Sequence, residues 1–260
     1  MSEALVLCES RPPAMVITLN RPDRRNALSR ELIADLAAAF TRVAQDPVVR
    51  CVVLAGAGSA FCAGMDLAEL QQSLDVPAES SPVWDDALRL ARLYDQIYTF
   101  PKPTIAAVQG AALAGGAGLV TVCDLAIAVP EAKFGYPEVR RGLVAAMVMP
   151  HLMRHVGERM ARYLLLAGEL IGGDDAVRCG LVNETVPAAA LMDRAMALAR
   201  ACAEGGPGAL ARTKEFLAQF SRQAVSIEAA AQGSAAPRLT EECRQGLRAF
   251  FAKQPAPWTV

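Results

Sequence analysis

A run of twenty residues without a charged side chain, Thr104 to Cys123, constrains the fold of this chain more than any other segment. Its length could span a bilayer, which needs about 20 apolar residues. However, the run consists mostly of Ala and Gly, contains Gln109 and has glycines at its centre, and Leu, Ile and Phe, which favour membrane insertion, are few. We therefore predict a buried strand, a glycine turn and a short helix inside a folded core, and no membrane span.

Apolar runs of strand length alternate with amphipathic helical segments along most of the chain. Ser29 is placed to cap one of these helices, "RELIADLAAAFTRVAQD", and residues 71–83 are predicted to form a surface loop. The alternation predicts an α/β domain with largely parallel strands over residues 1–190 and a helical region over residues 191–260. The predicted strands are "ALVLCES", "AMVITLN", "VRCVVLAG", "TIAAVQG", "DLAIAVP" and "LVNETVP".

The composition argues against several classes of protein. The net charge of -1, without a block of Lys or Arg, argues against nucleic acid or an anionic membrane surface as a partner. Seven widely spaced cysteines with no CxxC pair are typical of a reduced intracellular protein, and the N-terminus lacks the features of a signal peptide. We expect a cytoplasmic protein whose hydrophobic content of 53% leaves apolar surface for a subunit interface.

Three familiar site motifs are incomplete. The turn "GGAG" lies between a strand and a helix, but Gly116-x-Gly118 is followed by Leu-Val-Thr121, so no dinucleotide-binding GxGxxG pattern forms. His151 and His155 have the spacing of two metal ligands, yet no third ligand is near, so we expect surface or helix-capping histidines and no metal. No GxSxG sequence supplies a nucleophilic serine.

Two other segments share one local design, in which a glycine turn comes directly before a helix. They are "FCAGMDL", predicted as a loop that runs into a helix, and "LAGGAGL". Such turns leave backbone N–H groups unpaired, and the helix dipole favours an anion beside them. If both turns point at one place they form an oxyanion hole, although each alone also fits an ordinary tight turn. Glu138, in "KFGYPEVRRGL", alone fits a solvated surface acid.

Taken in order, these segments resemble the enoyl-CoA hydratase/isomerase (crotonase) superfamily over nearly the whole chain. The quoted motifs are "NRPDRRNALS", "FCAGMDL", "VQGAALAGGAGL", "AKFGYPEVRRGL" and "GLRAFFAKQPAPW", at the family's spacing. The resemblance implies a spiral of ββα units with a helical C-terminal trimerisation region, and therefore a homotrimer or a dimer of trimers. It also implies an acyl-CoA thioester as the substrate, with no separate cofactor.

The resemblance assigns roles to particular residues. It implies that the N–H groups of Met65 and Gly115 form the oxyanion hole and that Glu138 is the catalytic carboxylate. One departure is Gly118, which stands where the family's hydratases carry their first glutamate; another is "LVAAMVMP" after Gly142, in place of a glycine-rich segment. The residues implied to contact coenzyme A are Arg25, Ala27, Ala63, Gly64, Asp66, Leu67, Phe250 and Lys253.

The implied activity is that of an enoyl-CoA hydratase, with two alternatives. With Glu138 as the only acid, the site could move a proton from the alpha to the gamma carbon, which is Δ3–Δ2 enoyl-CoA isomerisation. Hydration by Glu138 alone, or with help from Glu69 or Tyr136, is a further possibility. A non-catalytic acyl-CoA-binding homologue is the alternative of another class.

Overall fold

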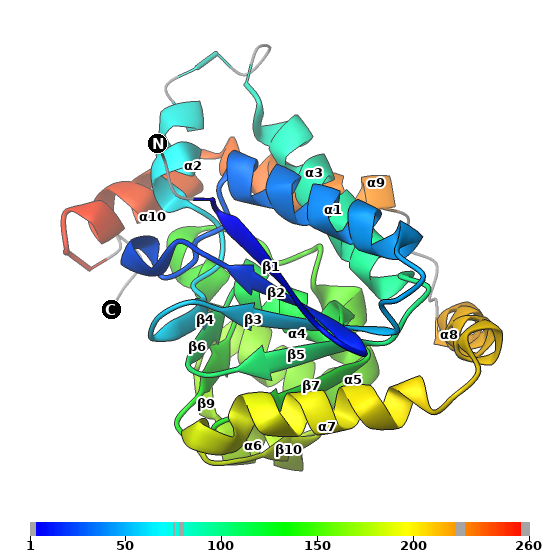
Figure 1. Cartoon of the computed structure of the whole chain (residues 1–260). Coiled ribbons are helices and arrows are strands. Elements are labelled where there is room, and N and C mark those ends of the chain that lie inside the picture. Colours follow the sequence, from blue (N-terminus) through cyan, green and yellow to red (C-terminus); the bar gives the residue numbers. More distant parts are fainter. Residues whose placement is uncertain (1–3, 75, 78–80, 222–226, 256–260) are drawn as a thin grey trace.

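Two β-sheets form the centre of the computed structural model, which describes residues 4–74, 76–77, 81–221 and 227–255 (Figure 1). The larger sheet has the strand order β1-β2-β3-β5-β7-β10. Within it β1 is antiparallel to β2, and all other neighbours are parallel. Its strands are β1 (Val6–Arg11), β2 (Ala14–Leu19), β3 (Cys51–Gly56), β5 (Thr104–Val108), β7 (Leu125–Ala128) and β10 (Glu184–Thr185).

The smaller sheet gives the fold its repeat. Its strand order is β4-β6-β8-β9, parallel except for the β8–β9 pair. Each of β4, β6 and β8 follows a strand of the larger sheet and precedes a helix, so strand, strand and helix recur along the chain, which confirms the predicted ββα architecture. The strands are β4 (Ala60–Cys62), β6 (Ala111–Leu113), β8 (Lys133–Gly135) and β9 (Ile171–Gly172).

The helices match the predicted amphipathic segments with some corrections. The cap is confirmed, because Ser29 Oγ accepts a hydrogen bond from the Leu32 N–H at 3.2 Å. The predicted loop over residues 71–83 is too long, since its first residues continue a helix. The helices are α1 (Arg30–Gln45), α2 (Leu67–Leu74), α3 (Val83–Tyr98), α4 (Gly115–Val122), α5 (Met149–Arg162), α6 (Gly173–Arg178), α7 (Leu191–Ala203), α8 (Pro207–Ser221), α9 (Ile227–Arg238) and α10 (Glu241–Phe251).

Several short turns of helix complete the chain. Two of them matter for the site. The turn η3 carries Glu138, the candidate catalytic acid, and η1 begins the loop that packs next to β4. The 3-10 helices are η1 (Pro22–Arg24), η3 (Pro137–Arg141) and η5 (Ala188–Ala190), and η4 (Tyr163–Ala167) is a π-helical turn.

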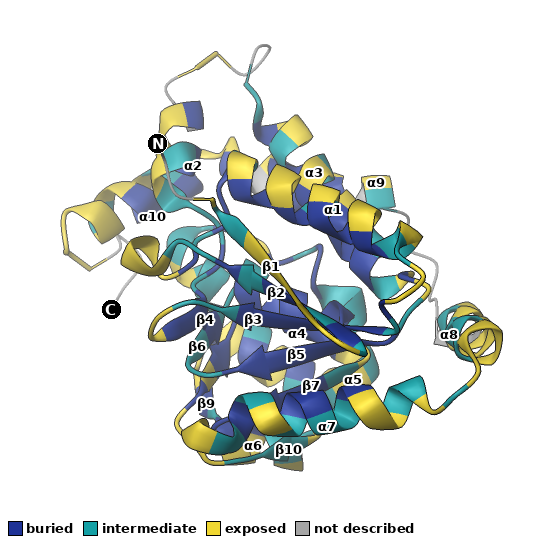
Figure 2. Cartoon of the chain, in the orientation of Figure 1, coloured by how far each residue is buried: buried dark blue, intermediate teal, exposed yellow. Residues whose placement is uncertain are grey.

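The uncharged run of twenty residues lies in the core, as predicted. Every residue of β5 is buried, and all of α4 after Gly115 is buried as well, so both appear dark blue in Figure 2 where they are visible. Within the described residues, no helix has both the length and the apolar character needed to cross a bilayer. Helix α7 packs against β2, β3, β5 and β7, so the first helix after residue 190 covers the larger sheet. The predicted boundary between a core over residues 1–190 and a helical region over residues 191–260 stays a prediction.

Candidate active site

A cavity of about 110 Å³ brings together the three residues predicted to act in catalysis. Met65, Gly115 and Glu138 all line it, although they come from the turn before α2, the start of α4 and η3. Most of the remaining wall is apolar, which lowers the local dielectric and strengthens polar contacts to a bound group. The other lining residues are Ala63, Leu67, Leu90, Tyr94, Leu113, Ala114, Pro137, Arg141, Leu143, Val144, Ala145, Met147, Val148, Ser234 and Arg238.

The first backbone donor is the Met65 N–H. Leu28 and Met65 form an isolated parallel bridge, in which the Leu28 N–H donates to the Gly64 carbonyl at 2.8 Å and the Asp66 N–H donates to the Leu28 carbonyl at 3.1 Å. Successive N–H groups of an extended chain point to opposite sides, so the Met65 N–H points away from Leu28. Among the described residues, nothing accepts a hydrogen bond from it.

The second donor is the Gly115 N–H at the first position of α4. A helix has no internal acceptor for its first N–H groups, and no described residue accepts from this one. Ala114, just before it, has φ 53° and ψ −124°, a conformation that costs an alanine free energy. The Ala114 N–H donates to the Gly135 carbonyl at 2.8 Å, which anchors the strained residue to β8. This strain sets the orientation of the peptide that carries the Gly115 N–H.

The two turns lie directly against each other. Gly64 has φ +93°, and a Cβ added there would lie 2.8 Å from Ala114 Cβ and 3.3 Å from the Gly115 nitrogen. Glycine is therefore required at Gly64 both for its backbone conformation and for this close approach. The contact puts on the wall of one cavity two N–H donors that no described residue pairs, which is what an oxyanion hole requires.

Glu138 supplies the carboxyl group. Its Oε2 atom is buried and has no hydrogen-bond partner among the described residues. Burial raises the pKa of Glu138 to about 7, because the charged form loses its hydration, while Arg141 and Arg238 oppose the shift. A carboxyl group with a pKa near neutrality can both accept and return a proton at physiological pH. The sequence alone fitted a solvated acid, so the structure corrects that interpretation.

A glutamate side chain at position 118, where the family's hydratases carry their first acid, would not fit without a rearrangement of its neighbours. A Cβ added there would lie 2.5 Å from Tyr94 Oη and 2.6 Å from Val148 Cγ1. Tyr94, on α3, is almost completely buried, and its hydroxyl donates to the Gly115 carbonyl at 2.7 Å. The sequence showed the missing acid but gave no sign of Tyr94, which looks like an ordinary apolar-face residue of an amphipathic helix. Neither Glu69 nor Tyr136 lines the cavity, which argues against the suggested help from them.

The loop after η1 is tied to β4 and to the start of α2. Asn26 is fully buried, and its Nδ2 donates to the carbonyls of Ala57, Ala60 and Phe61 at 2.9, 2.8 and 3.1 Å. Sequence reasoning missed this residue, although an Asn inside a polar loop is a signal for a side-chain-stabilised turn. In the structure Asn26 has φ 55°, which Asn tolerates better than most residues. Asn26 fixes the backbone on which the predicted coenzyme A contacts Arg25 and Ala27 stand.

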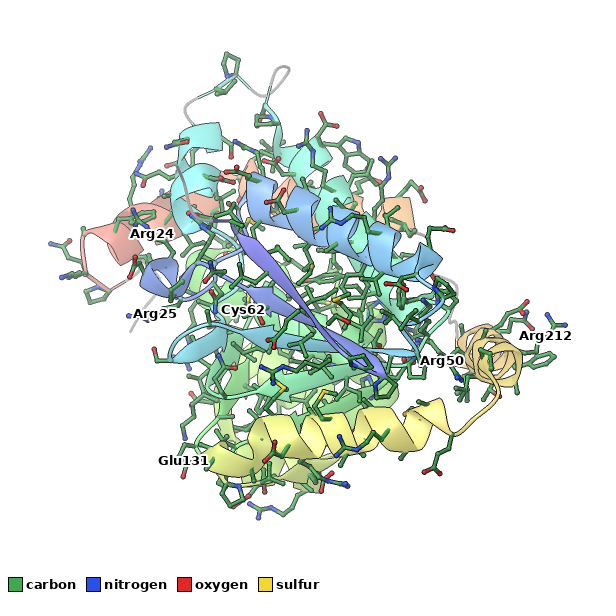
Figure 3. All side chains as sticks on the ribbon, in the orientation of Figure 1. Arg24, Arg25, Arg50, Cys62, Glu131 and Arg212 are labelled. Atoms are coloured by element: carbon green, nitrogen blue, oxygen red, sulfur yellow. The ribbon has the colours of Figure 1, made fainter. Side chains whose placement is uncertain are left out.

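Most of the predicted coenzyme A contacts lie on two neighbouring segments, residues 25–27 and 63–67. The Arg25 carbonyl accepts a hydrogen bond from the Ala63 N–H at 2.9 Å, while its side chain is exposed at the edge of the molecule in Figure 3. The guanidinium of Arg21 donates to the Ala27 carbonyl at 2.6 Å and pairs with Asp66 at 3.0 Å. Ala63 and Leu67 line the cavity; Asp66 does not, and instead Asp66 Oδ1 accepts from the Ala68 N–H at 3.1 Å.

The two C-terminal positions lie at the end of α10. Phe250 is 42% exposed, and the Arg141 guanidinium lies 4.3 Å from the centre of its ring, which links α10 to η3. Lys253 is exposed and has φ 54°, with its N–H donating to the Phe250 carbonyl at 3.1 Å. Neither residue lines the cavity, but Phe250 is in contact with its wall through Arg141.

The histidines are bound to other groups of the protein. His155 Nε2 lies 2.9 Å from the Thr121 carbonyl, and His151 packs against the ring of Tyr98. His155 is exposed and contacts a carbonyl in the last turn of α4, as expected of a surface or helix-capping histidine, whereas His151 is only partly exposed. In the described part of the chain no group of three or more His, Cys, Asp or Glu residues could hold a metal ion.

An α/β spiral that places two backbone donors and one half-buried acid on the wall of one cavity is the framework of an enzyme that acts on a carbonyl compound. The family described as Enoyl-CoA hydratase/isomerase matches residues 12–260. A Thermus thermophilus protein that carries an enoyl-CoA hydratase name is 44% identical, over 92% of this chain and 95% of its own. The chain therefore belongs to the enoyl-CoA hydratase/isomerase family.

Further relatives agree with this assignment. The 2,3-dehydroadipyl-CoA hydratase of Escherichia coli is 33% identical, with 98% of this chain and 97% of that protein covered. The crystal structure of an enoyl-CoA hydratase/isomerase from Xanthobacter autotrophicus superposes with a TM-score of 0.87 at 31% identity, over 100% of both chains. The predicted superfamily and its fold are confirmed by these matches.

Proposed function

We propose that the protein is an enzyme of the enoyl-CoA hydratase type, which adds water to the double bond of an α,β-unsaturated acyl-CoA. The observation that carries this proposal is the meeting of Glu138, with its pKa raised to about 7 by burial, and two unpaired backbone N–H groups in one cavity. The names of the relatives support the same class of substrate and reaction.

In the proposed mechanism the thioester oxygen accepts hydrogen bonds from the Met65 and Gly115 N–H groups. These donors stabilise the negative charge that develops on oxygen when a nucleophile adds at the beta carbon, an effect worth about 3 kcal/mol per donor in comparable sites. The Glu138 carboxylate takes a proton from water as the water oxygen bonds to the beta carbon. The same carboxyl group then gives a proton to the alpha carbon, so one molecule of water is added in total.

Several parts of the proposal concern binding. The backbone from Arg25 to Ala27 and the segment from Ala63 to Leu67 would hold the nucleotide part of coenzyme A, with Phe250 and Lys253 at the entrance. Assembly as a homotrimer or a dimer of trimers is supported by exposed apolar side chains such as Leu166 and Phe251. A cytoplasmic location is supported by seven cysteines that are all free thiols.

One observation favours a second candidate, Δ3–Δ2 enoyl-CoA isomerase. Tyr94 and Val148 fill the space beside Gly118, so the side of the cavity where hydratases of the family carry another acid holds a hydroxyl and a methyl group instead. Glu138 would then remove a proton from the alpha carbon and return it to the gamma carbon, while the oxyanion hole stabilises the dienolate between the two steps. No water molecule enters the products.

Both candidates are tested by one assay with purified protein. Crotonyl-CoA reports hydration, and 3-hexenoyl-CoA reports migration of the double bond, with Glu138→Gln as the matched inactive variant. Hydration that depends on Glu138 supports the first candidate, and migration without hydration supports the second. If wild-type protein binds acyl-CoA but converts neither substrate, both candidates are wrong and the chain is a non-catalytic binding homologue.

A further inference from the structure

A buried guanidinium forms part of the cavity wall and has no role in the mechanism above. Arg238, the last residue of α9, is 2% exposed, and Ser234, one turn earlier, is 4% exposed. Both line the cavity that contains Glu138 and the two backbone donors. Among the described residues, the hydrogen bonding of Arg238 consists of one contact, from its Nη2 to Ser234 Oγ at 3.0 Å.

No carboxylate of the described residues lies within ion-pair distance of Arg238. Asp86 is one of the acids that act on it electrostatically, but both Asp86 oxygens are bound by Arg30, at 2.8 and 2.7 Å. Glu138 also acts on it, yet with a pKa of about 7 that group is only partly ionised at neutral pH. Burial lowers the pKa of Arg238 to about 10, which still leaves the guanidinium charged.

A buried charge without a partner is unfavourable, and native proteins rarely retain one. A guanidinium has five N–H donors in a planar fork, which fits the two oxygens of a carboxylate. Ser234 Oγ accepts from Arg238, so the hydroxyl proton of Ser234 is free to donate to a second acceptor. The pair is therefore a preformed site for an anion at the wall of an otherwise apolar cavity.

The surrounding wall suits a short hydrocarbon chain. Leu90, Leu143, Val144, Met147 and Val148 line the same cavity as Met65, Gly115 and Arg238. A thioester carbonyl held by the two backbone donors would place its acyl chain against these apolar side chains. A polar group at the far end of that chain is the part of a substrate that Arg238 and Ser234 can recognise.

We propose that the acyl group of the natural substrate ends in a carboxylate that is bound by Arg238 and Ser234. The substrate class is the mono-CoA thioester of an unsaturated dicarboxylic acid. This inference rests on the proposed function, because the thioester end must occupy the oxyanion hole. The carboxylate would neutralise the buried guanidinium and form two charge-assisted hydrogen bonds with it.

The test compares the binding of two saturated esters that cannot react, hexanoyl-CoA and adipoyl-CoA. They share the coenzyme and the chain length and differ in the terminal group, so the ratio of their dissociation constants isolates the contribution of the carboxylate. By isothermal titration calorimetry we expect wild-type protein to bind adipoyl-CoA roughly 10- to 100-fold more tightly, as charge-assisted hydrogen bonds in a buried site allow. Arg238→Met should abolish this preference, and Arg238→Lys should keep part of it.

Two further variants make the result decisive. Arg212→Met removes an exposed arginine of α8 that does not line the cavity and is labelled at the edge of the molecule in Figure 3, and it should leave the ratio unchanged. Ser234→Ala should reduce the preference without removing the charge, and it keeps the test valid if Arg238→Met does not fold. A wild-type ratio near one, or a preference that survives in Arg238→Met, overturns the proposal.

Another role of Arg238 would give a different pattern. If Arg238 served only to adjust the ionisation of Glu138, Arg238→Met would shift the pH profile of turnover equally for neutral and carboxylate-ended enoyl-CoA, and the binding ratio would stay near one. That pattern also overturns the proposal. Because the two saturated esters need no turnover, selective binding without any hydration or isomerisation would refute the proposed function and still show that Arg238 and Ser234 bind a carboxylate.

Discussion

Replacing Glu138 by Gln should make the folded protein more stable above pH 7. Burial raises the pKa of Glu138 from the ordinary 4.5 to about 7, so the folded state disfavours the carboxylate that the unfolded chain forms freely. Because a tenfold change in an ionisation equilibrium corresponds to about 1.4 kcal/mol, raising the pKa from 4.5 to about 7 costs about 3 kcal/mol of folding stability above pH 7. Gln has the same shape and no charge, so it removes this cost.

The sign of the pH dependence follows from the direction of the shift. Below pH 4.5 the carboxyl group is protonated in both states, and the wild type carries no penalty from it. Between pH 4.5 and 7 only the unfolded chain is ionised, so stability falls as the pH rises toward the folded pKa. The advantage of Glu138→Gln should therefore be near zero at pH 4.5, grow through this window and level off above pH 7.

Urea unfolding at fixed protein concentration, at about pH 5 and pH 8, measures this difference. Glu131→Gln, at an exposed position labelled in Figure 3, is the matched control and should show no such gain. In Glu138→Gln, kcat should fall by about 10²- to 10⁴-fold. The wild-type kcat/KM should rise with pH to a plateau above about pH 7, because the Glu138 carboxylate acts as the base. Equal stability of both proteins at pH 8 would refute the assigned burial of the charge.

Three other substitutions test the residues that shape the cavity and the loops beside it. Gly118→Ala should destabilise the protein by about 1–3 kcal/mol in thermal unfolding, because its Cβ would meet Tyr94 and Val148; unchanged stability would show that the space is open. Tyr94→Phe removes the hydrogen bond to the Gly115 carbonyl, so we expect kcat to fall with a stability loss of only about 1 kcal/mol, and an unchanged kcat would exclude a positioning role. Asn26→Ala should cost about 2–4 kcal/mol in urea unfolding and weaken coenzyme A binding in calorimetry, whereas Asn20→Ala, at an exposed bond, should do neither.

Local sequence patterns were enough to predict the larger sheet and most of the helices. Ser29 before a periodic apolar segment predicted the start of α1, and the uncharged run from Thr104 predicted a buried strand and helix. The strands β4 and β6 were missed, because three residues are too few to show an alternation, and their pairing depends on partners far along the chain. These strands form because successive ββα units pair with each other, and a local sequence pattern carries no information about that pairing.

The residues of the site also fall into those that a local sequence pattern predicts and those that only the packing reveals. Backbone donors sit in glycine turns, and such turns leave a sequence signal, so Met65 and Gly115 could be predicted together with the family resemblance. Tyr94 and Arg238 leave none, since a tyrosine and an arginine on amphipathic helices are usual, and only the packing of α3 and α9 places them in the cavity.

This difference bears on the reaction itself. The sequence shows that the usual first acid is missing at Gly118, but an empty position could have held water in its place. The structure fills it with the Tyr94 ring, whose hydroxyl is committed to the Gly115 carbonyl. Any water that reacts must therefore be held by Glu138 and the substrate, without a second carboxylate opposite. If turnover proves to be hydration, Glu138 must both activate that water and protonate the alpha carbon, and a single ionisation near pH 7 should then govern the rate in both directions.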